Sequence, residues 1–206
     1  MFEAQISTNR SRTGFAMLEL IYHSVVRDIR KSHRNAAMGL LMNMMQTVIF
    51  VLAFFGIFAV LGIRGSAIRG DFLLYIMSGI FLFMTHTKAV SAVVMAEGPA
   101  SPMMQHAPMN TFISISAAAL SSLYIQVLSL VAILFIYHVV FVPITIHNPA
   151  GAMAMVLVAW FCGVAVGLIL LALKPWLPDL VRILVNIYSR GNMLASGKMF
   201  VANTLP

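Results

Sequence analysis

The chain has 206 residues, of which 61% are hydrophobic and only 9% charged, and its mean hydropathy is +0.94. Soluble proteins are about 45–50% apolar and about 25% charged, so this chain has too few charges to cover a surface that faces water. The composition excludes a soluble enzyme, a disordered tail, a coiled coil and a disulfide scaffold. It predicts an all-α, polytopic helical membrane protein.

The net charge of +7 does not indicate a nucleic-acid partner, because the basic residues are unevenly placed. Six of the 13 precede the first long apolar stretch: Arg10, Arg12, Arg27, Arg30, Lys31 and Arg34. In a membrane protein such a block orients the chain and contacts anionic lipid headgroups. We therefore expect residues 1–34 to be a leader on the cytoplasmic side.

Part of this leader is predicted to be an amphipathic helix, over Phe15–Arg34. Apolar side chains recur in steps of three and four, at Leu18, Ile21, Tyr22, Val25 and Ile29, and the basic side chains lie on the opposite face. A helix of this kind lies along a membrane surface. It acts either as a simple anchor or as a docking surface for a cytoplasmic partner, and the pattern alone does not decide between them.

Residues 35–206 are predicted to form the transmembrane domain. Charge-free stretches of about 20 residues can cross the hydrocarbon core, and prolines divide the longest of them. The predicted spans lie near 39–62, 72–95, 111–141, 150–173 and 180–202. The fifth carries Arg182, Arg190 and Lys198, so we expect it to pack against protein.

The lysine and arginine count places the N-terminus in the cytoplasm. Loops 97–110 and 174–179 would then face the cytoplasm, and loops 63–71 and 142–149 would face outward. Within the second span, His86 and Lys88 are polar groups at membrane depth, which often mark a pore or proton relay. Alternatively, Lys88 reaches toward lipid phosphates or pairs with Glu97.

Other motifs indicate packing rather than chemistry. Gly163 and Gly167 have the four-residue spacing that lets two membrane helices approach closely. The segment GNMLASGKM is not a phosphate-binding loop, because five residues separate its glycines and Met199 replaces the required hydroxyl. The scattered histidines show no metal-ligand spacing. The sequence thus predicts no catalytic residue, cofactor or metal site.

Three segments together resemble the membrane permease of ABC type-2 transporters, in the branch that exports capsular and related cell-surface polysaccharides. VVRDIRKSHRNAAMGLLMNMMQT is similar to the family's amphipathic entry helix and first span. LLYIMSGIFLFMTHTKAVSAVVMAEGPASPMM is similar to its second span and the cytoplasmic turn that follows. GVAVGLILLALKPWLPDLVRILVNIY is similar to its fourth and fifth spans. The family has a sixth span, and the resemblance covers five.

The resemblance implies a homodimer in the bacterial inner membrane, paired with a separate ABC ATPase, so that the chain itself is not an enzyme. Three groups of residues would carry its function. The ATPase-coupling loop would include Glu97, Met103, Met104, Gln105 and His106. The interface helix would include Arg27, Asp28, Arg30 and Lys31, and the glycan path Phe54, Phe55, Phe58 and Tyr188.

ATP hydrolysis in the partner would move the coupling loop, tilt the packed spans and open the seam between two permease copies to the glycan. The coupling loop lacks the family's basic residues, so apolar insertion of Met103 and Met104 would replace electrostatic docking. Two other functions stay open. One is a secondary transporter or channel gated by His86 and Lys88, and the other is a membrane scaffold whose basic leader recruits a partner.

Overall fold

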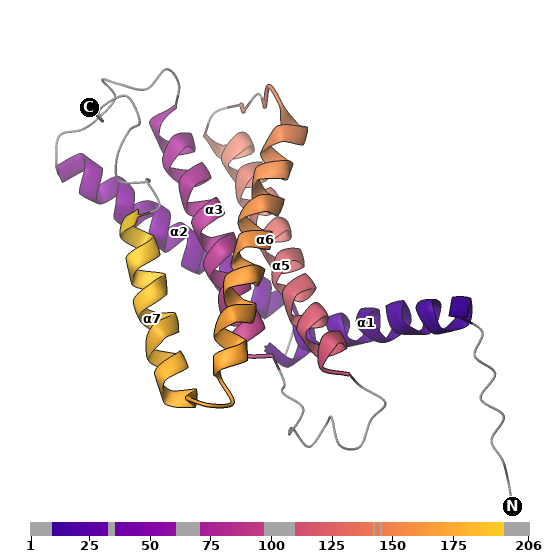
Figure 1. Cartoon of the computed structure of the whole chain (residues 1–206). Coiled ribbons are helices and arrows are strands. Elements are labelled where there is room, and N and C mark those ends of the chain that lie inside the picture. Colours follow the sequence, from indigo (N-terminus) through magenta and orange to yellow (C-terminus); the bar gives the residue numbers. More distant parts are fainter. Residues whose placement is uncertain are drawn as a thin grey trace, which may run out of the picture.

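The computed structural model describes residues 10–32, 36–60, 71–96, 110–141, 143–144 and 146–195. All regular structure in these ranges is helical (Figure 1). The helices are α1 (Arg10–Ser32), α2 (Ala36–Val60), α3 (Phe72–Val94), α5 (Thr111–Val140), α6 (Pro149–Leu173) and α7 (Pro178–Ala195).

Four of these helices, α2, α3, α5 and α6, are long and apolar enough to cross a membrane. Their bounds closely match the first four predicted spans, which confirms the prediction of an all-α, polytopic membrane protein. α7 has 18 residues and is not among the four. The fifth predicted span, near 180–202, runs beyond the described residues and stays a prediction.

Polar side chains define where three of these spans begin. Asp71 accepts a hydrogen bond from the Leu73 amide (2.9 Å), and Asn110 accepts one from the Phe112 amide (3.4 Å). Asn148 accepts one from the amide of Gly151 (2.8 Å). The first amides of a helix have no partner within it, so these N-caps satisfy donors that would otherwise be costly near hydrocarbon.

α3 is the central helix of the bundle. It contacts α2, α5, α6 and α7, and 50% of its membrane window is buried, against 22–28% for the other three spans. Its side chains Ile80, Ala89, Val90 and Val93 are fully enclosed. The other described elements are arranged around this helix, so the contacts of α3 position every polar group discussed below.

The closest approach in the bundle is between α3 and α6, and two glycines permit it. A β-carbon on Gly163 would lie 2.5 Å from the His86 carbonyl oxygen, and one on Gly167 would lie 2.8 Å from Val93 Cβ. Both values are shorter than real contacts allow. The prediction that Gly163 and Gly167 serve helix packing is therefore confirmed, and the packing is within one chain.

Hydrogen bonds between helices fix both ends of the bundle and its middle. At one end the Tyr137 hydroxyl of α5 donates to Asp71, the residue that caps α3. At the other end Lys174 Nζ donates to the Val94 carbonyl oxygen (2.6 Å), which joins the last turn of α3 to the end of α6. Between them Trp160 Nε1 of α6 donates to the Ala119 carbonyl oxygen of α5 (2.9 Å).

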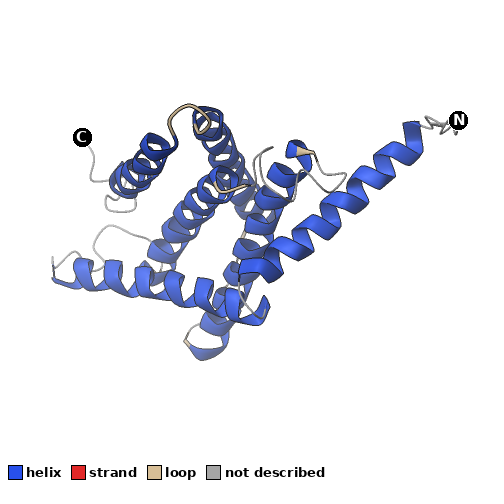
Figure 2. Cartoon of the chain, turned by 90° about the horizontal axis from the view of Figure 1, so that it is seen from below, coloured by secondary structure: helices blue, strands red, loops and turns tan. Residues whose placement is uncertain are grey.

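α1 and α7 lie at the margins of the four spans. α1 lies beside the bundle, toward the end where α6 turns into α7, and its first turns extend away from the other helices (Figures 1 and 2). It packs against α5 and α2. The predicted amphipathic helix is thus present and begins earlier than expected, at Arg10. α7 packs on α3 and α6 through the buried side chain of Val181.

The glycine contact predicts that Gly163→Ala destabilises the protein. The new methyl group would meet the backbone of α3, which cannot rotate away, and overpacking of this kind costs about 1–3 kcal/mol. The measurement is the thermal unfolding midpoint of the purified chain in mild detergent.

Gly56→Ala is the matched control, because Gly56 lies inside α2 with open space around its α-carbon. We expect its midpoint to equal or exceed that of the wild type. Equal midpoints for the two variants would contradict the role assigned to Gly163.

Candidate functional site

A cavity of about 750 Å³ with both polar and apolar lining residues lies between α2, α3 and α5, with the last turns of α1 at its rim. Two charged side chains line it, Asp28 and Lys88. The uncharged polar lining consists of Asn43, Gln46, Ser91, Ser121, Ser122 and Gln126, and the apolar lining includes Met42, Met45, Ile49 and Phe50. We call it the Lys88 cavity. Polar groups at membrane depth are costly and usually functional, so this cavity is the candidate site.

One wall of the cavity is held by a hydrogen-bonded amide pair. Asn43 Nδ2 of α2 donates to Gln126 Oε1 of α5 (2.5 Å) and to Ser129 Oγ (2.8 Å). The three side chains are buried. Ser129 in turn donates to the Ile125 carbonyl oxygen of its own helix (2.7 Å). Because each of the three side chains has a hydrogen-bond partner, the network is compatible with an apolar bundle, and it ties α2 to α5.

Lys88 projects from α3 toward α2, where its Nζ donates to Gln46 Oε1 (2.6 Å). Among the described residues, no carboxylate forms an ion pair with this ammonium group. The acidic residue in the cavity lining is Asp28, and its Oδ1 lies 3.5 Å from Arg27 Nη2. The cavity therefore presents a positive charge that is met by a neutral amide.

His86 lies on the opposite face of α3. Its Nδ1 is 3.1 Å from the Ala159 carbonyl oxygen of α6, and its Nε2 is 2.7 Å from the Tyr188 hydroxyl of α7. A carbonyl can only accept, so in the neutral ring Nδ1 donates and Nε2 accepts the hydroxyl proton of Tyr188. This arrangement links three helices by one imidazole.

His86 and Lys88 do not form one site. Residues two apart in a helix point in nearly opposite directions, and here they face α6 with α7 and α2, respectively. The hypothesis of a single gate built from both side chains thus receives no support from their placement. His86 joins helices, whereas Lys88 lines a cavity.

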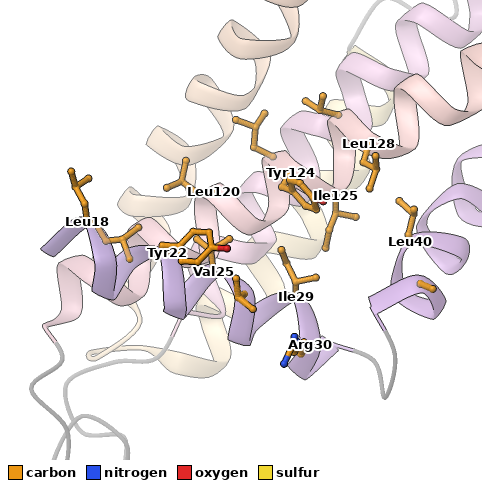
Figure 3. Close-up of a pocket in the computed structure, with 15 residues that line it drawn as sticks. Leu18, Tyr22, Val25, Ile29, Arg30, Leu40, Leu120, Tyr124, Ile125 and Leu128 are labelled. Atoms are coloured by element: carbon orange, nitrogen blue, oxygen red, sulfur yellow. The ribbon is translucent and has the colours of Figure 1, made fainter. Parts of the chain in front are cut away.

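A second, apolar hollow of about 940 Å³ lies between α1, the start of α2 and the middle of α5 (Figure 3). Leu18, Tyr22, Val25 and Ile29 of α1 line it, facing Leu120, Tyr124 and Leu128 of α5. These α1 positions are those of the predicted apolar stripe. The stripe therefore faces the protein's own α5, and Leu18 and Tyr22 also remain exposed.

The other predicted site residues fall in three environments. Phe54 and Phe58 are buried in the core where α2 meets α3, Phe55 packs on Phe72, and Tyr188 is on α7 beside His86. Arg27, Asp28 and Arg30 are on α1, as is Lys31. Glu97, Met103, Met104, Gln105 and His106 lie outside the described residues. The structure thus does not gather the four aromatic residues into one surface.

Sequence reasoning missed the residues that build the cavity wall, Asn43, Gln46 and Gln126. The sequence does contain a signal for them, because amide side chains inside otherwise apolar spans need hydrogen-bond partners. Searching only for charged residues left them out. For metals, no group of three or more His, Cys, Asp or Glu side chains lies together in the described ranges.

The amide network predicts that Asn43→Leu weakens the packing of α2 on α5. Two interhelical hydrogen bonds would be lost, and such bonds are worth about 0.6 kcal/mol on average and up to about 1.7 kcal/mol. We expect a loss of about 1–2 kcal/mol in the free energy of unfolding, measured by titration with a denaturing detergent.

Thr47→Val is the control for this measurement. Thr47 is equally buried on α2, but its hydroxyl donates to the Asn43 carbonyl oxygen of its own helix (2.9 Å). Its loss should therefore be clearly smaller. If Thr47→Val were as destabilising as Asn43→Leu, the interhelical bonds would not be the source of the effect.

Comparison with protein-family models, with curated proteins and with solved structures finds no match to this chain. The functional argument accordingly depends on the arrangement of its own residues.

Proposed function

We propose that the chain is the membrane-spanning permease subunit of an ABC-type exporter, driven by a separate ATPase and carrying a cell-surface polysaccharide across the bacterial inner membrane. Two copies of the permease would enclose the path. The proposal rests on the resemblance of the three sequence segments. The observation that best supports it is the position of α1.

α1 is a basic amphipathic helix that lies against α5, toward one end of the bundle. The same end holds the last turn of α3 and the start of α5, which are joined by residues 97–109. A motor that binds this end would meet α1 together with the last turn of α3 and the start of α5. Motion of α1 would pass directly to α5 through the side chains of the apolar hollow.

The glycan path is less directly supported. Phe54 and Phe58 contribute to the core between α2 and α3, so a path along them requires α2 to move away from α3. α2 has a polar contact with α3 at Lys88 and one with α5 at Asn43. Movement of α2 would have to break these two contacts and also separate Phe54 and Phe58 from the core, and helix movements of this kind occur in gated transitions.

A secondary transporter or channel is the competing function, and the Lys88 cavity is the observation that favours it. A positive side chain in a cavity at membrane depth suits an anion that moves down its gradient. The two functions differ in their energy source. Export that survives ATP depletion and stops when the proton gradient collapses would favour the secondary transporter.

The exporter proposal predicts a stable complex with an ABC ATPase. The full chain, tagged at one terminus and purified in mild detergent, should retain a subunit that carries a nucleotide-binding loop, and the complex should hydrolyse ATP with vanadate sensitivity. Charge reversal on α1, Arg27→Glu with Arg30→Glu, should reduce its recovery several-fold. Arg190→Glu, on α7, is the control.

Recovery of the chain without any ATPase, under conditions that keep it monodisperse, would contradict an ABC exporter. Deletion of the gene should also remove a surface polysaccharide from the cell. If the chain binds the ATPase but deletion of its gene leaves the surface polysaccharides unchanged, the motor assignment stands and the proposed substrate is contradicted.

The proposed orientation predicts the accessibility of residue 101. In a Cys162→Ser background, Ser101→Cys should resist a membrane-impermeant maleimide in intact cells and react in inverted vesicles. Cys162 must be replaced because it is exposed on α6. Ready modification in intact cells would reverse the topology and leave α1 on the side opposite to any ATPase.

A further inference from the structure

The Lys88 cavity has three properties that together identify a class of ligand. Its lining includes the ammonium group of Lys88, it opens sideways along α2, and Lys88 lies near the last residue of α3. The proposed gate involves the contact of Lys88 with Gln46, but none of the three properties depends on what the chain transports. The inference below is therefore independent of whether the chain exports a polysaccharide.

The first property is charge. The Lys88 ammonium group carries three donors, and its hydrogen bond to Gln46 uses one. A charge at membrane depth is normally paired or placed toward water, and in the described part of the chain no carboxylate pairs with it. Asp28, at the rim, has Arg27 beside it. The interior of the cavity therefore attracts an anion.

The second property is the direction of the opening. Met42, Met45 and Ile49 of α2 line the cavity and are also 51%, 50% and 58% exposed. All three lie within the first membrane-spanning helix. Side chains that are apolar, exposed and within a span contact lipid. A ligand that enters past them comes from the bilayer and carries an apolar portion.

The third property is depth. Lys88 precedes the last residue of α3, Val94, by six positions, which at about 1.5 Å per residue places its α-carbon about 9 Å from the helix end. The long side chain of a lysine reaches from this depth to the level of lipid headgroups. Ser91, one turn further on, adds a hydroxyl to the same lining.

We propose that the Lys88 cavity binds the phosphate headgroup of an anionic membrane lipid. The phosphate oxygens would accept hydrogen bonds from Lys88 Nζ, and the acyl chains would lie along Met42, Met45 and Ile49. The amide network of Asn43 and Gln126 would hold the wall against which the headgroup rests. The lipid would bridge α2 and α3 beside the hydrogen bond between Lys88 and Gln46.

The test uses the purified full chain in an uncharged detergent, with no ATPase present. Phosphatidylglycerol, phosphatidylcholine with the same acyl chains, or inorganic phosphate is added, and the thermal unfolding midpoint and the lipid retained in native mass spectra are measured. Phosphatidylglycerol should raise the midpoint by several degrees more than phosphatidylcholine. Inorganic phosphate should have little effect, because it lacks the apolar portion.

Lys88→Gln should abolish the difference between the two lipids, and Arg182→Gln should preserve it. Arg182 is the matched control because it removes the same charge from an exposed position on α7. Met45→Trp, which fills the lateral opening without changing charge, should also reduce the difference and replaces Lys88→Gln if that variant does not fold.

Three results would overturn the proposal. If both lipids raised the unfolding midpoint of the wild type equally, the site would not distinguish a charged headgroup from a neutral one. A full effect of inorganic phosphate would mean a site for a soluble anion. If Lys88→Gln kept the full lipid difference, the lysine would not be the group that binds the headgroup.

Discussion

The approach of α6 to the backbone of α3 is the contact on which the other features depend. In a bilayer, lipid tails are as apolar as the side chains of a helix, so association relies on close packing and on hydrogen bonds. Gly163 and Gly167 remove the side chains that would keep the two helices apart. With α6 held against it, α3 offers one face to α6 and α7 and the other to α2 and α5.

This division of α3 separates two kinds of polar group. His86 faces α6 and α7, and both of its ring nitrogens are hydrogen-bonded, one to the Ala159 carbonyl oxygen and one to the Tyr188 hydroxyl. Lys88 faces α2, where its ammonium group contacts Gln46 and a cavity remains beside the two helices. The neighbours that each face of α3 meets thus decide which of the two polar residues joins helices and which lines a cavity.

Much of the fold could be predicted from the sequence because it depends on local signals. Charge-free length fixes the four spans, and capping residues such as Asp71, Asn110 and Asn148 mark their starts. The three-and-four spacing of Leu18, Ile21 and Tyr22 fixes the amphipathic character of α1. The four-residue spacing of Gly163 and Gly167 indicates a packing face, although it does not name the partner helix.

The candidate site could not be predicted in the same way. Spans that are apolar all round carry no stripe that tells which face meets which neighbour, so the pairing of Asn43 with Gln126, 83 residues apart, is visible only in three dimensions. The separation of His86 from Lys88 is different, because helical periodicity alone places them on opposite faces. The burial of Phe54 and Phe58 again depends on tertiary packing, which places both side chains in the core between α2 and α3.

The two tryptophans of the chain give it built-in optical reporters. Trp160 is half-buried between α6 and α5, with its indole N–H bonded to the Ala119 carbonyl oxygen and its ring edge-on to Phe161. Trp176 is 83% exposed in the turn after α6. Indole emission shifts with the polarity around the ring, so a Trp176→Phe protein would report through Trp160 alone on separation of these two helices, without an attached dye.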